Sequence, residues 1–321
     1  MDSEILLKAK EMFGVTTKIK RVTEGFQNIV YSYGEGGREK YLRITPAKLR
    51  NMNLIASEIA FILALHDGGI PVSLPVKSAA GNFIETVHHK WGPYHLVSFE
   101  AASGCPVDVT QPDIWNKGLF NKWGRMMGNM HKIAANNVKR DLVRPVGLEA
   151  DASIFCGVCP FVPDIIREKY QEHLKVLSDL SRTPDLFGLM HNDFHQGNFR
   201  VESGEITLFD FDDCAYYWYA NDIAASFYHA NWQNTSFNGK NEKFTELFFY
   251  EFFDGYTKEF TLHKEMTEQI PLFLKHREFF LLDLFTKNWD IDQLETWQSY
   301  TLKDLKERIE QEKPVIDQLL L

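Results

Sequence analysis

The stretch HNDFHQGNF, residues 191–199, places an acid and an amide at a fixed short interval within one segment. Asp193 precedes Asn198 by five positions, and the apolar run ITLF ends directly before Asp210 in the sequence FDFDD. Carboxylate and amide oxygens are the hard ligands that Mg²⁺ prefers, and a carboxylate beside a hydroxyl can accept its proton. These residue types therefore predict a site that holds a metal-bound phosphate and passes it to a hydroxyl group.

The spacing of these residues matches a signature of protein kinases. His191, Asp193 and Asn198 fit the pattern H-x-D-x-x-x-x-N, which in kinases is followed by a strand that ends in D-F. Here we expect a hairpin that turns at Gly204, with its second strand delivering Asp210. Single His, Asn and Asp residues often serve only as turn formers. The full set, at these offsets, favours a catalytic loop.

The same motifs resemble those of the aminoglycoside phosphotransferase and choline kinase family, the small-molecule branch of the protein-kinase-like fold. HNDFHQGNF resembles the HGDxHxGN catalytic loop, FDFDD the metal-binding DFD or DFE segment, and YANDIA, residues 219–224, the later D-[IL]-A element. The resemblance follows nearly the whole chain and is strongest over residues 191–224. It implies an α+β, two-lobed protein-kinase-like fold, with a small N-terminal antiparallel sheet lobe and a larger, mainly helical C-terminal lobe.

The resemblance also implies roles for individual residues. Asp193 is expected to be the catalytic base, and Asn198 and Asp210 are expected to bind Mg²⁺. His191 is expected to be a structural member of the loop. Asp222 is expected to be a buried acid that supports the loop, although a helix N-cap is an equally good interpretation of this residue.

Three positions depart from common kinase patterns. Asn192 replaces the glycine that usually follows the histidine, which is a small change if the local φ is negative. Asp212 stands where protein kinases have glycine, as is normal in the small-molecule branch. Arg43, in YLRIT, occupies the position of the ATP-binding lysine of protein kinases. Arginine keeps the positive charge and adds a bidentate fork, so phosphate binding is preserved.

The N-terminal lobe is expected to bind ATP. TEGFQNIVYSYG resembles the family's loose phosphate loop, in which Gly25 permits a tight turn and Asn28 reaches the phosphates. Glu58, on the following helix, is the expected ion-pair partner of Arg43, and a solvated helix charge is the alternative. Residues 96–104 form the expected hinge whose backbone meets adenine. The candidate nucleotide-binding residues are Gly25, Asn28, Arg43, Glu58, Ser98 and Glu100.

The acceptor site in this family is built from residues after the catalytic loop and from the C-terminal helices. Both regions are aromatic and acidic here, which favours a cationic acceptor through charge pairing and cation–π contact. The alternative is that most of these aromatic residues belong to the core. Homoserine, choline-like amines, amino sugars and aminoglycosides all fit this chemistry. The candidate acceptor residues are Asp213, Tyr216, Trp218, Trp289 and Asp290, within a set that also holds Tyr217, Tyr219, Trp232 and Asp292.

The surrounding sequence predicts the elements that position these residues. Residues 1–98 are expected to form the nucleotide-binding lobe, 99–105 the hinge, and 106–321 the catalytic and acceptor-binding lobe. Short β-branched or aromatic runs predict strands, and apolar residues at helical spacing predict helices. The expected strands cover 18–24, 28–36, 38–46, 73–78 and 94–102, and the expected helices cover 49–69, 114–135 and a segment ending near 180, with long aromatic helices after the motif.

The composition limits the possible partners. The 321 residues are 44% hydrophobic with a net charge of −9, which argues against nucleic acid or an anionic membrane as a partner. No apolar run approaches the roughly 18 residues of a membrane span, and the charged N-terminal segment does not resemble a signal peptide. We therefore expect a cytoplasmic protein. Cys156 and Cys159 form a lone CxxC pair without a second pair for zinc, which favours reduced thiols.

These observations predict an ATP- and Mg²⁺-dependent kinase that phosphorylates a hydroxyl of a small molecule, with amine-containing acceptors preferred. Two alternatives belong to other classes: a protein serine/threonine kinase of the same fold, and a non-catalytic nucleotide-binding protein. Retention of Asp193, Asn198 and Asp210 together speaks against the non-catalytic alternative. The sequence predicts no particular acceptor and no oligomeric state, and it does not distinguish ATP from GTP.

Overall fold

The computed structural model describes residues 3–23, 28–34, 39–136, 141–157, 161–239 and 242–316. Gly25 and Cys159 lie outside the described residues, whereas Cys105, Cys156 and Cys214 are free thiols. By its internal contacts the chain divides into two compact units. Unit 1 comprises Met1–Cys105, Asn137–Arg144 and Phe199–Asp212, and unit 2 comprises Pro106–Asn136, Pro145–Asn198 and Asp213–Leu321. The catalytic stretch therefore contributes to both units, with Asn198 ending a segment of unit 2.

Unit 1 is built on an antiparallel sheet. Its strands are β1 (Lys20–Val22), β2 (Ile29–Tyr33), β3 (Lys40–Pro46), β4 (Pro75–Val76), β5 (Ile84–His89) and β6 (Gly92–Glu100). The strand order is β1-β2-β3-β6-β4, and β5 also pairs with β6. The strands expected around residues 20, 30, 43 and 95 are present. β5 was not predicted, because its sequence IETVHH carries few apolar residues and its pairing depends on the neighbouring β6.

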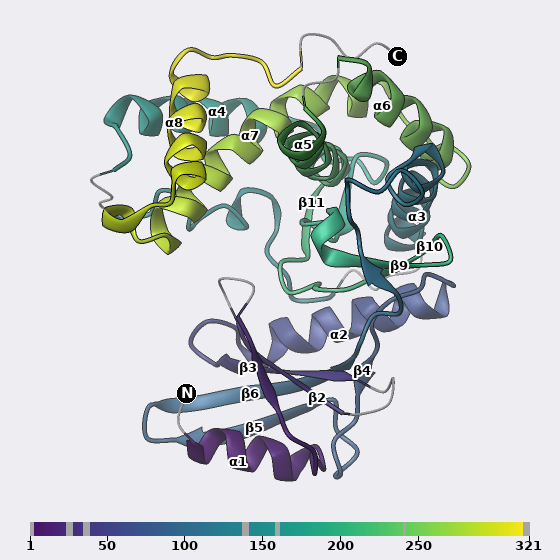
Figure 1. The fold of residues 1–321 in the computed structure, drawn as a ribbon, viewed down its shortest axis with the longest axis vertical. Helices are drawn as coiled ribbons and strands as arrows, with labels where there is room; N and C mark the ends of the chain where they lie inside the picture. Colours follow the sequence, from purple (N-terminus) through teal and green to yellow (C-terminus); the bar gives the residue numbers. More distant parts are fainter. Residues whose placement is uncertain are drawn as a thin grey trace. The chain divides into compact units, whose positions relative to one another are not determined.

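Two helices cover the sheet of unit 1. α1 (Ser3–Met12) and α2 (Met52–Asp67) lie on opposite faces of it (Figure 1). Successive residues of a strand point to opposite faces, so Leu96 packs with residues of α1 while Val97 packs with residues of α2. The side chain of Asn51 caps α2 by accepting a hydrogen bond from the backbone N–H of Leu54 at 3.0 Å. This cap fixes the start of the helix that carries Glu58.

The predicted hairpin after the catalytic loop is confirmed. β9 (Phe199–Glu202) pairs with β10 (Glu205–Leu208), and β9 also pairs with the short β7 (Cys105–Pro106). The two-residue turn has φ of 52° at Ser203 and 79° at Gly204. Positive φ at both central positions is the geometry of the type I′ hairpin turn, which glycine adopts without strain. β10 ends at Leu208, two residues before Asp210, so the hairpin leads to this acid as the sequence predicted.

Unit 2 is mainly helical. Its longer helices are α3 (Lys117–Asn136), α4 (Asp164–Ser178), α5 (Tyr219–Asn238), α6 (Glu242–Tyr256), α7 (Lys264–Asn288) and α8 (Thr296–Glu310), with the short helices η1 (Gly147–Glu149), η2 (Gln196–Asn198) and η3 (Ile291–Gln293). β8 (Phe187–Met190) pairs antiparallel with β11 (Ala215–Trp218). This pair frames the catalytic loop, since β8 ends immediately before His191 and β11 begins shortly after Asp213.

The packing of α3 against α6 depends on small residues. A Cβ atom at Gly124 would lie 1.9 Å from the backbone oxygen of Phe252, so any other residue would force the helices apart. Around this close approach, Trp123 packs against Phe248 and Phe252 in edge-to-face contacts. Many aromatic residues of the C-terminal half thus form core, whereas Phe237, Tyr250, Trp297 and Tyr300 are exposed. Among the described helices, none has the length and apolar character needed to cross a membrane.

Candidate functional site

The predicted site residues lie in both units, and each group has its own internal geometry. In unit 2 the loop that follows β8 carries Asp193 and Asn198. Asn192 in this loop has φ of 71°, in the left-handed region that glycine favours. Replacing glycine by asparagine here was expected to be a small change only if φ were negative, and this condition is not met. Asparagine tolerates this region better than most residues, and its Nδ2 donates to the backbone oxygen of Asp213 at 3.2 Å.

Asp222 holds the backbone of this loop. Its Oδ1 accepts a hydrogen bond from the N–H of Asn192 at 2.7 Å, and its Oδ2 accepts one from the N–H of His191 at 3.2 Å. Asp222 lies inside the first turn of α5, and the N-cap position is Trp218, so the N-cap interpretation of Asp222 does not apply. The carboxylate is fully buried, and its hydrogen bonds fix two successive residues before Asp193.

A neutral histidine completes the support of the loop. Burial lowers the pKa of His131, although its contact with Asp222 opposes this change. Nε2 of His131 lies 3.3 Å from Oδ2 of Asp222, and Nδ1 lies 2.8 Å from the hydroxyl of Tyr256. A neutral ring can donate to the carboxylate and accept from the hydroxyl. The predicted loop residue His191 is also buried, and its Nδ1 accepts from the N–H of Asp193 at 3.3 Å.

Both oxygens of Asp193 are hydrogen-bonded within unit 2. Nδ2 of Asn198 donates to Oδ2 at 2.9 Å, Nε2 of His195 lies 3.3 Å from the same oxygen, and Nη2 of Arg277 donates to Oδ1. Burial raises the pKa of Asp193, but the neighbouring His195 and Arg277 outweigh burial and hold it well below its usual value. Asp193 is therefore ionised. Because the amide nitrogen of Asn198 faces Asp193, its amide oxygen is the atom that remains to bind a metal.

Arg277 and His229 were not predicted from the sequence. Arg277 lies on α7, and its Nε donates to Nε2 of His229, on α5, at 3.1 Å. The rings of His195 and His229 stack with centroids 4.2 Å apart. The ligand atoms of Asp193, His195 and His229 lie within 4.8 Å of one another, a spacing that could suit a metal ion. However, the guanidinium of Arg277 already bonds to both Asp193 and His229, so the cluster contains its own cation.

The expected ion pair of unit 1 is present. Arg43, on β3, donates from Nη1 and Nη2 to the two carboxylate oxygens of Glu58, on α2, at 2.9 and 2.6 Å. Glu58 is 1% exposed, so it is not a solvated helix charge. Burial lowers the pKa of Arg43, but Glu58 and Asp212 outweigh burial and raise it. Arg43 therefore stays charged in the interior of unit 1.

Asp210 and Asp212, two of the acids that follow β10, have different surroundings. Asp212 is buried, lies 3.5 Å from Nη1 of Arg43 and 3.4 Å from Nη2 of Arg50, and accepts from Nδ2 of Asn28 at 3.0 Å. Burial raises the pKa of Asp212, but Arg43 and Arg50 outweigh it and lower the pKa. Asp210 is exposed and has φ of 64°. Of the two, Asp210 is the more exposed, and its charge also helps to raise the pKa of Arg43.

The hinge candidates have partners inside unit 1. The hydroxyl of Ser98 lies 2.7 Å from that of Tyr33, and Ser98 is fully buried in β6. The N–H of Glu100 donates to the backbone oxygen of Leu74 at 2.8 Å, and its own backbone oxygen accepts from the hydroxyl of Ser73. Adenine recognition through these residues stays a prediction.

The acceptor candidates occupy different environments. Trp218 is 0% exposed, and its Nε1 donates to the backbone oxygen of Ser181 at 2.8 Å, so its side chain belongs to the core, as the alternative interpretation held. Asp213 and Tyr216 are half-buried. Trp289 is half-buried and stacks on Phe285 with centroids 4.1 Å apart. Asp290 is exposed and caps η3.

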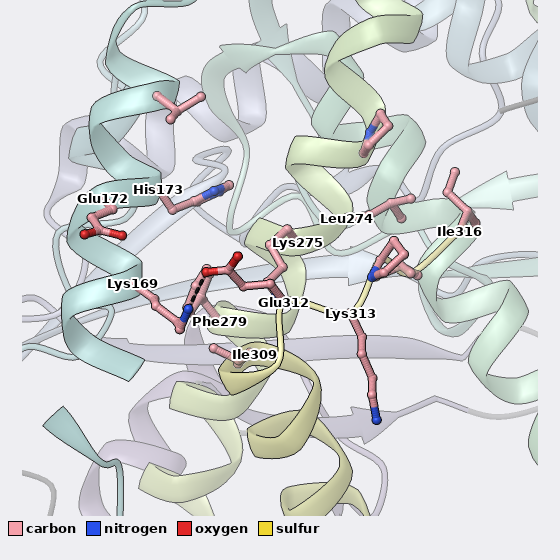
Figure 2. A pocket seen from close by; sticks show the side chains of 14 residues that line it. Lys169, Glu172, His173, Leu274, Lys275, Phe279, Ile309, Glu312, Lys313 and Ile316 are labelled. Atoms are coloured by element: carbon pink, nitrogen blue, oxygen red, sulfur yellow. Dashed lines mark hydrogen bonds and ion pairs between the residues drawn. The ribbon is translucent and has the colours of Figure 1, made fainter. Parts of the chain in front are cut away.

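A pocket of about 350 Å³ lies elsewhere in unit 2 (Figure 2). Residues of α4, α7 and the segment after α8 line it, among them His173, Lys275 and Lys313, and the ion pair between Lys169 and Glu312 lies at its edge. None of the predicted site residues is among its described lining residues. The pocket is therefore separate from the predicted site.

Comparisons with known proteins agree with these features. The model of the phosphotransferase enzyme family, APH, matches residues 18–256. An amicoumacin kinase of Bacillus subtilis (strain 168) is 29% identical over 320 residues, which cover 98% of this chain and 94% of that protein. The solved structure of an amicoumacin kinase in complex with AMP-PNP, Ca²⁺ and Ami is 28% identical with a TM-score of 0.89, covering 98% of this chain and 95% of the other.

A more distant structure has the same fold. The microcompartment-associated aminopropanol kinase is 20% identical with a TM-score of 0.73, and the match covers 97% of this chain and 98% of that one. The α+β, two-lobed kinase-like fold predicted from the sequence is thereby confirmed. Because the family model matches well over half of its residues, the chain belongs to the phosphotransferase enzyme family.

Proposed function

We propose that the protein transfers the γ-phosphate of ATP, in the presence of Mg²⁺, to a hydroxyl group of a small amine-containing molecule. The observation that carries this proposal is the hydrogen-bonded pair of Asp193 and Asn198, which offers an ionised carboxylate and an amide oxygen from one loop. The relative that is 28% identical, solved with AMP-PNP and Ca²⁺, supports a nucleotide and a divalent metal ion here.

Asp193 would orient the acceptor hydroxyl. A hydroxyl within about 3 Å of its carboxylate can donate a hydrogen bond to it and later transfer its proton. Because the pKa of Asp193 is held low, the carboxylate is a weak base in the ground state. It therefore accepts the proton only late, as the new bond to phosphorus forms. This timing suits phosphoryl transfer, whose loose transition state needs little help from a base.

Asn198 and Asp210 would hold the metal ion. A carboxylate and an amide oxygen suit Mg²⁺, which prefers hard oxygen ligands and keeps several waters. The exposed Asp210 fits this role better than Asp212, which is buried. Bound there, Mg²⁺ would neutralise negative charge on the phosphates as it develops.

Arg43 and Asn28 would act on the nucleotide phosphates from unit 1. Arg43 is anchored by Glu58 through two hydrogen bonds, so its guanidinium is fixed before any ligand arrives. Asn28 bonds through its amide to Asp212 and accepts from the hydroxyl of Thr45 at 3.1 Å. Pre-ordered groups of this kind lower the entropy lost on binding.

The acceptor proposed is an amine-containing metabolite or antibiotic. The relatives at 29% and 28% identity are named amicoumacin kinases, and structures of the same fold include a spectinomycin phosphotransferase and an aminopropanol kinase. These names favour a small molecule over a protein acceptor.

The test is release of ADP from ATP and Mg²⁺ with a panel of acceptors: amicoumacin, aminoglycosides, spectinomycin, homoserine, choline and 1-amino-2-propanol. Asp193→Asn is the control, because it keeps the shape of the side chain and an oxygen to face Arg277. Acceptor-dependent release that disappears in the variant is expected. Nucleotide binding without release for any small acceptor, together with phosphorylation of a protein substrate, would contradict the proposal.

A further inference from the structure

Among the described residues, Arg277 is a partner of the Asp193 carboxylate from outside its own loop. Oδ2 accepts from Asn198, five residues away, whereas Oδ1 accepts from Nη2 of Arg277 on α7, 84 residues away in the sequence. The guanidinium therefore lies directly beside the carboxylate to which an acceptor hydroxyl must bind.

Arg277 is held rigidly in this position. Its side chain is 7% exposed, its Nε and Nη2 both lie within hydrogen-bonding distance of Nε2 of His229, and its Cζ lies 4.7 Å from the centre of the Phe280 ring. A buried guanidinium persists where its charge is paired and its planar face is packed. Arg277 is thus a fixed cation.

His229 contacts the guanidinium without adding a negative charge. Its ring stacks on that of His195 at 4.2 Å, and its Nε2 accepts from Arg277 at 3.1 Å. Among the ion pairs of the described residues, the carboxylate that contacts Arg277 is that of Asp193. The hydrogen bonds of Arg277 to other described residues use Nε and Nη2, so Nη1 is the nitrogen left to donate to an oxygen atom of a ligand.

This geometry restricts the part of the acceptor that adjoins the reacting hydroxyl. A hydroxyl within about 2.6–3.2 Å of Asp193 brings its neighbouring carbon atoms close to the guanidinium. An ammonium group on the adjacent carbon would meet a like charge there. A carbonyl or carboxylate oxygen would instead accept a charge-assisted hydrogen bond.

We propose that Arg277 determines acceptor specificity by selecting molecules with a carbonyl or carboxylate oxygen on the carbon next to the reacting hydroxyl. The amine of the acceptor lies farther along the molecule. This inference rests on the proposed function, because it assumes that Asp193 binds the acceptor hydroxyl.

The test compares two probes with the same carbon skeleton. Lactamide carries a carbonyl beside its hydroxyl-bearing carbon, and 1-amino-2-propanol carries an ammonium-bearing carbon in the same place. Each is measured as an acceptor by kcat/KM and as an inhibitor of acceptor-independent ADP release. The proteins compared are wild type, Arg277→Gln, Arg277→Lys and Arg125→Gln, the last a matched control at an exposed arginine of the same unit.

We expect wild type to prefer lactamide by about tenfold to a hundredfold, the range for one hydrogen bond to a charged group. Arg277→Gln should reduce this ratio at least tenfold, while Arg277→Lys and Arg125→Gln should preserve the direction of the preference. If Arg277 had a purely structural role, its replacement would lower kcat/KM for lactamide and for 1-amino-2-propanol together and leave their ratio unchanged.

Three results would overturn the inference: equal or better use of 1-amino-2-propanol by wild type, an unchanged ratio in Arg277→Gln, or no effect of either probe in both assays. Binding of Mg·ATP, measured separately by calorimetry, distinguishes this failure from failure of the proposed function. If wild type binds no nucleotide, the proposed function falls and the inference falls with it.

Discussion

Replacing Asp222 by asparagine should destabilise unit 2 by about 1–3 kcal/mol, the scale for leaving a buried hydrogen-bond donor without a partner. Three donors surround the two oxygens of Asp222: the N–H groups of His191 and Asn192, and Nε2 of His131. An asparagine side chain offers one acceptor oxygen and places an NH₂ group where the second oxygen was. At least one buried donor would then lack a partner, at a cost of about 1–3 kcal/mol, and the charge-assisted bonds would weaken.

The free energy of unfolding, from urea denaturation followed by circular dichroism and tryptophan fluorescence, measures this loss. Asp113→Asn is the matched control, because Asp113 is an exposed acid of the same unit. The same substitution at Asp222 should also lower kcat, since the backbone on the N-terminal side of Asp193 loses its anchor. A loss of stability below about 1 kcal/mol, the value of an ordinary surface change, would refute the role given to this network.

The remaining predictions concern charges in both units. Arg43→Met should destabilise the protein by about 3–5 kcal/mol, because it leaves Glu58 buried without its partner, and Arg43→Lys should lose less stability. Urea denaturation and the Kd for Mg·ATP test both variants. Equal stability of wild type and the two variants would contradict the ion pair between Arg43 and Glu58. Burial, with help from His276 and Lys275, lowers the pKa of His173 to about 3. In the unfolded chain the pKa of this histidine is near 6.5. At a pH between the two pKa values, the unfolded chain therefore binds one more proton than the folded protein. The free energy of unfolding then falls as the pH falls, by at most about 1.4 kcal/mol per pH unit. His173→Phe should therefore lose less stability than wild type between pH 6 and pH 4, and parallel pH profiles would show that His173 titrates normally.

The sequence predicted the parts of the site that depend on short intervals. Asp193 and Asn198 are five residues apart, and their hydrogen bond follows from one loop. The hairpin after them was predicted from Gly204, which suits a turn with positive φ. The pairing of Arg43 with Glu58 was predicted from a kinase-like pattern and from the apolar residues that flank Glu58.

The contacts made over long intervals were not predicted. Arg277 lies in a helix rich in charged residues, and its sequence gives no indication that it faces Asp193 rather than solvent. His229 lies on α5, where a histidine between Tyr228 and Ala230 gives no indication of a partner on α7. The family pattern predicts a routine substitution for glycine at Asp212, whereas the fold places Arg43 and Arg50 beside it. Tertiary packing, which brings distant segments together, decides these contacts.

The pairing of short strands was also beyond the local pattern. β8 and β11 are four residues each and are separated by the whole catalytic loop. Trp218, at the end of β11, was a candidate for the acceptor site because aromatic faces bind cations. The structure buries it completely, since the strand pair places it between Phe187 and Phe273.

The most direct test of the central claim is mass spectrometry of the acceptor after incubation with ATP and Mg²⁺. Wild-type protein should add one phosphoryl group to a small hydroxyl compound and release one equivalent of ADP, and Asp193→Asn should bind Mg·ATP but leave the acceptor unmodified. Equal phosphorylation of the acceptor by wild type and Asp193→Asn would contradict the assignment of Asp193. ATP binding with no modified small molecule would contradict the claim that this protein is a small-molecule phosphotransferase.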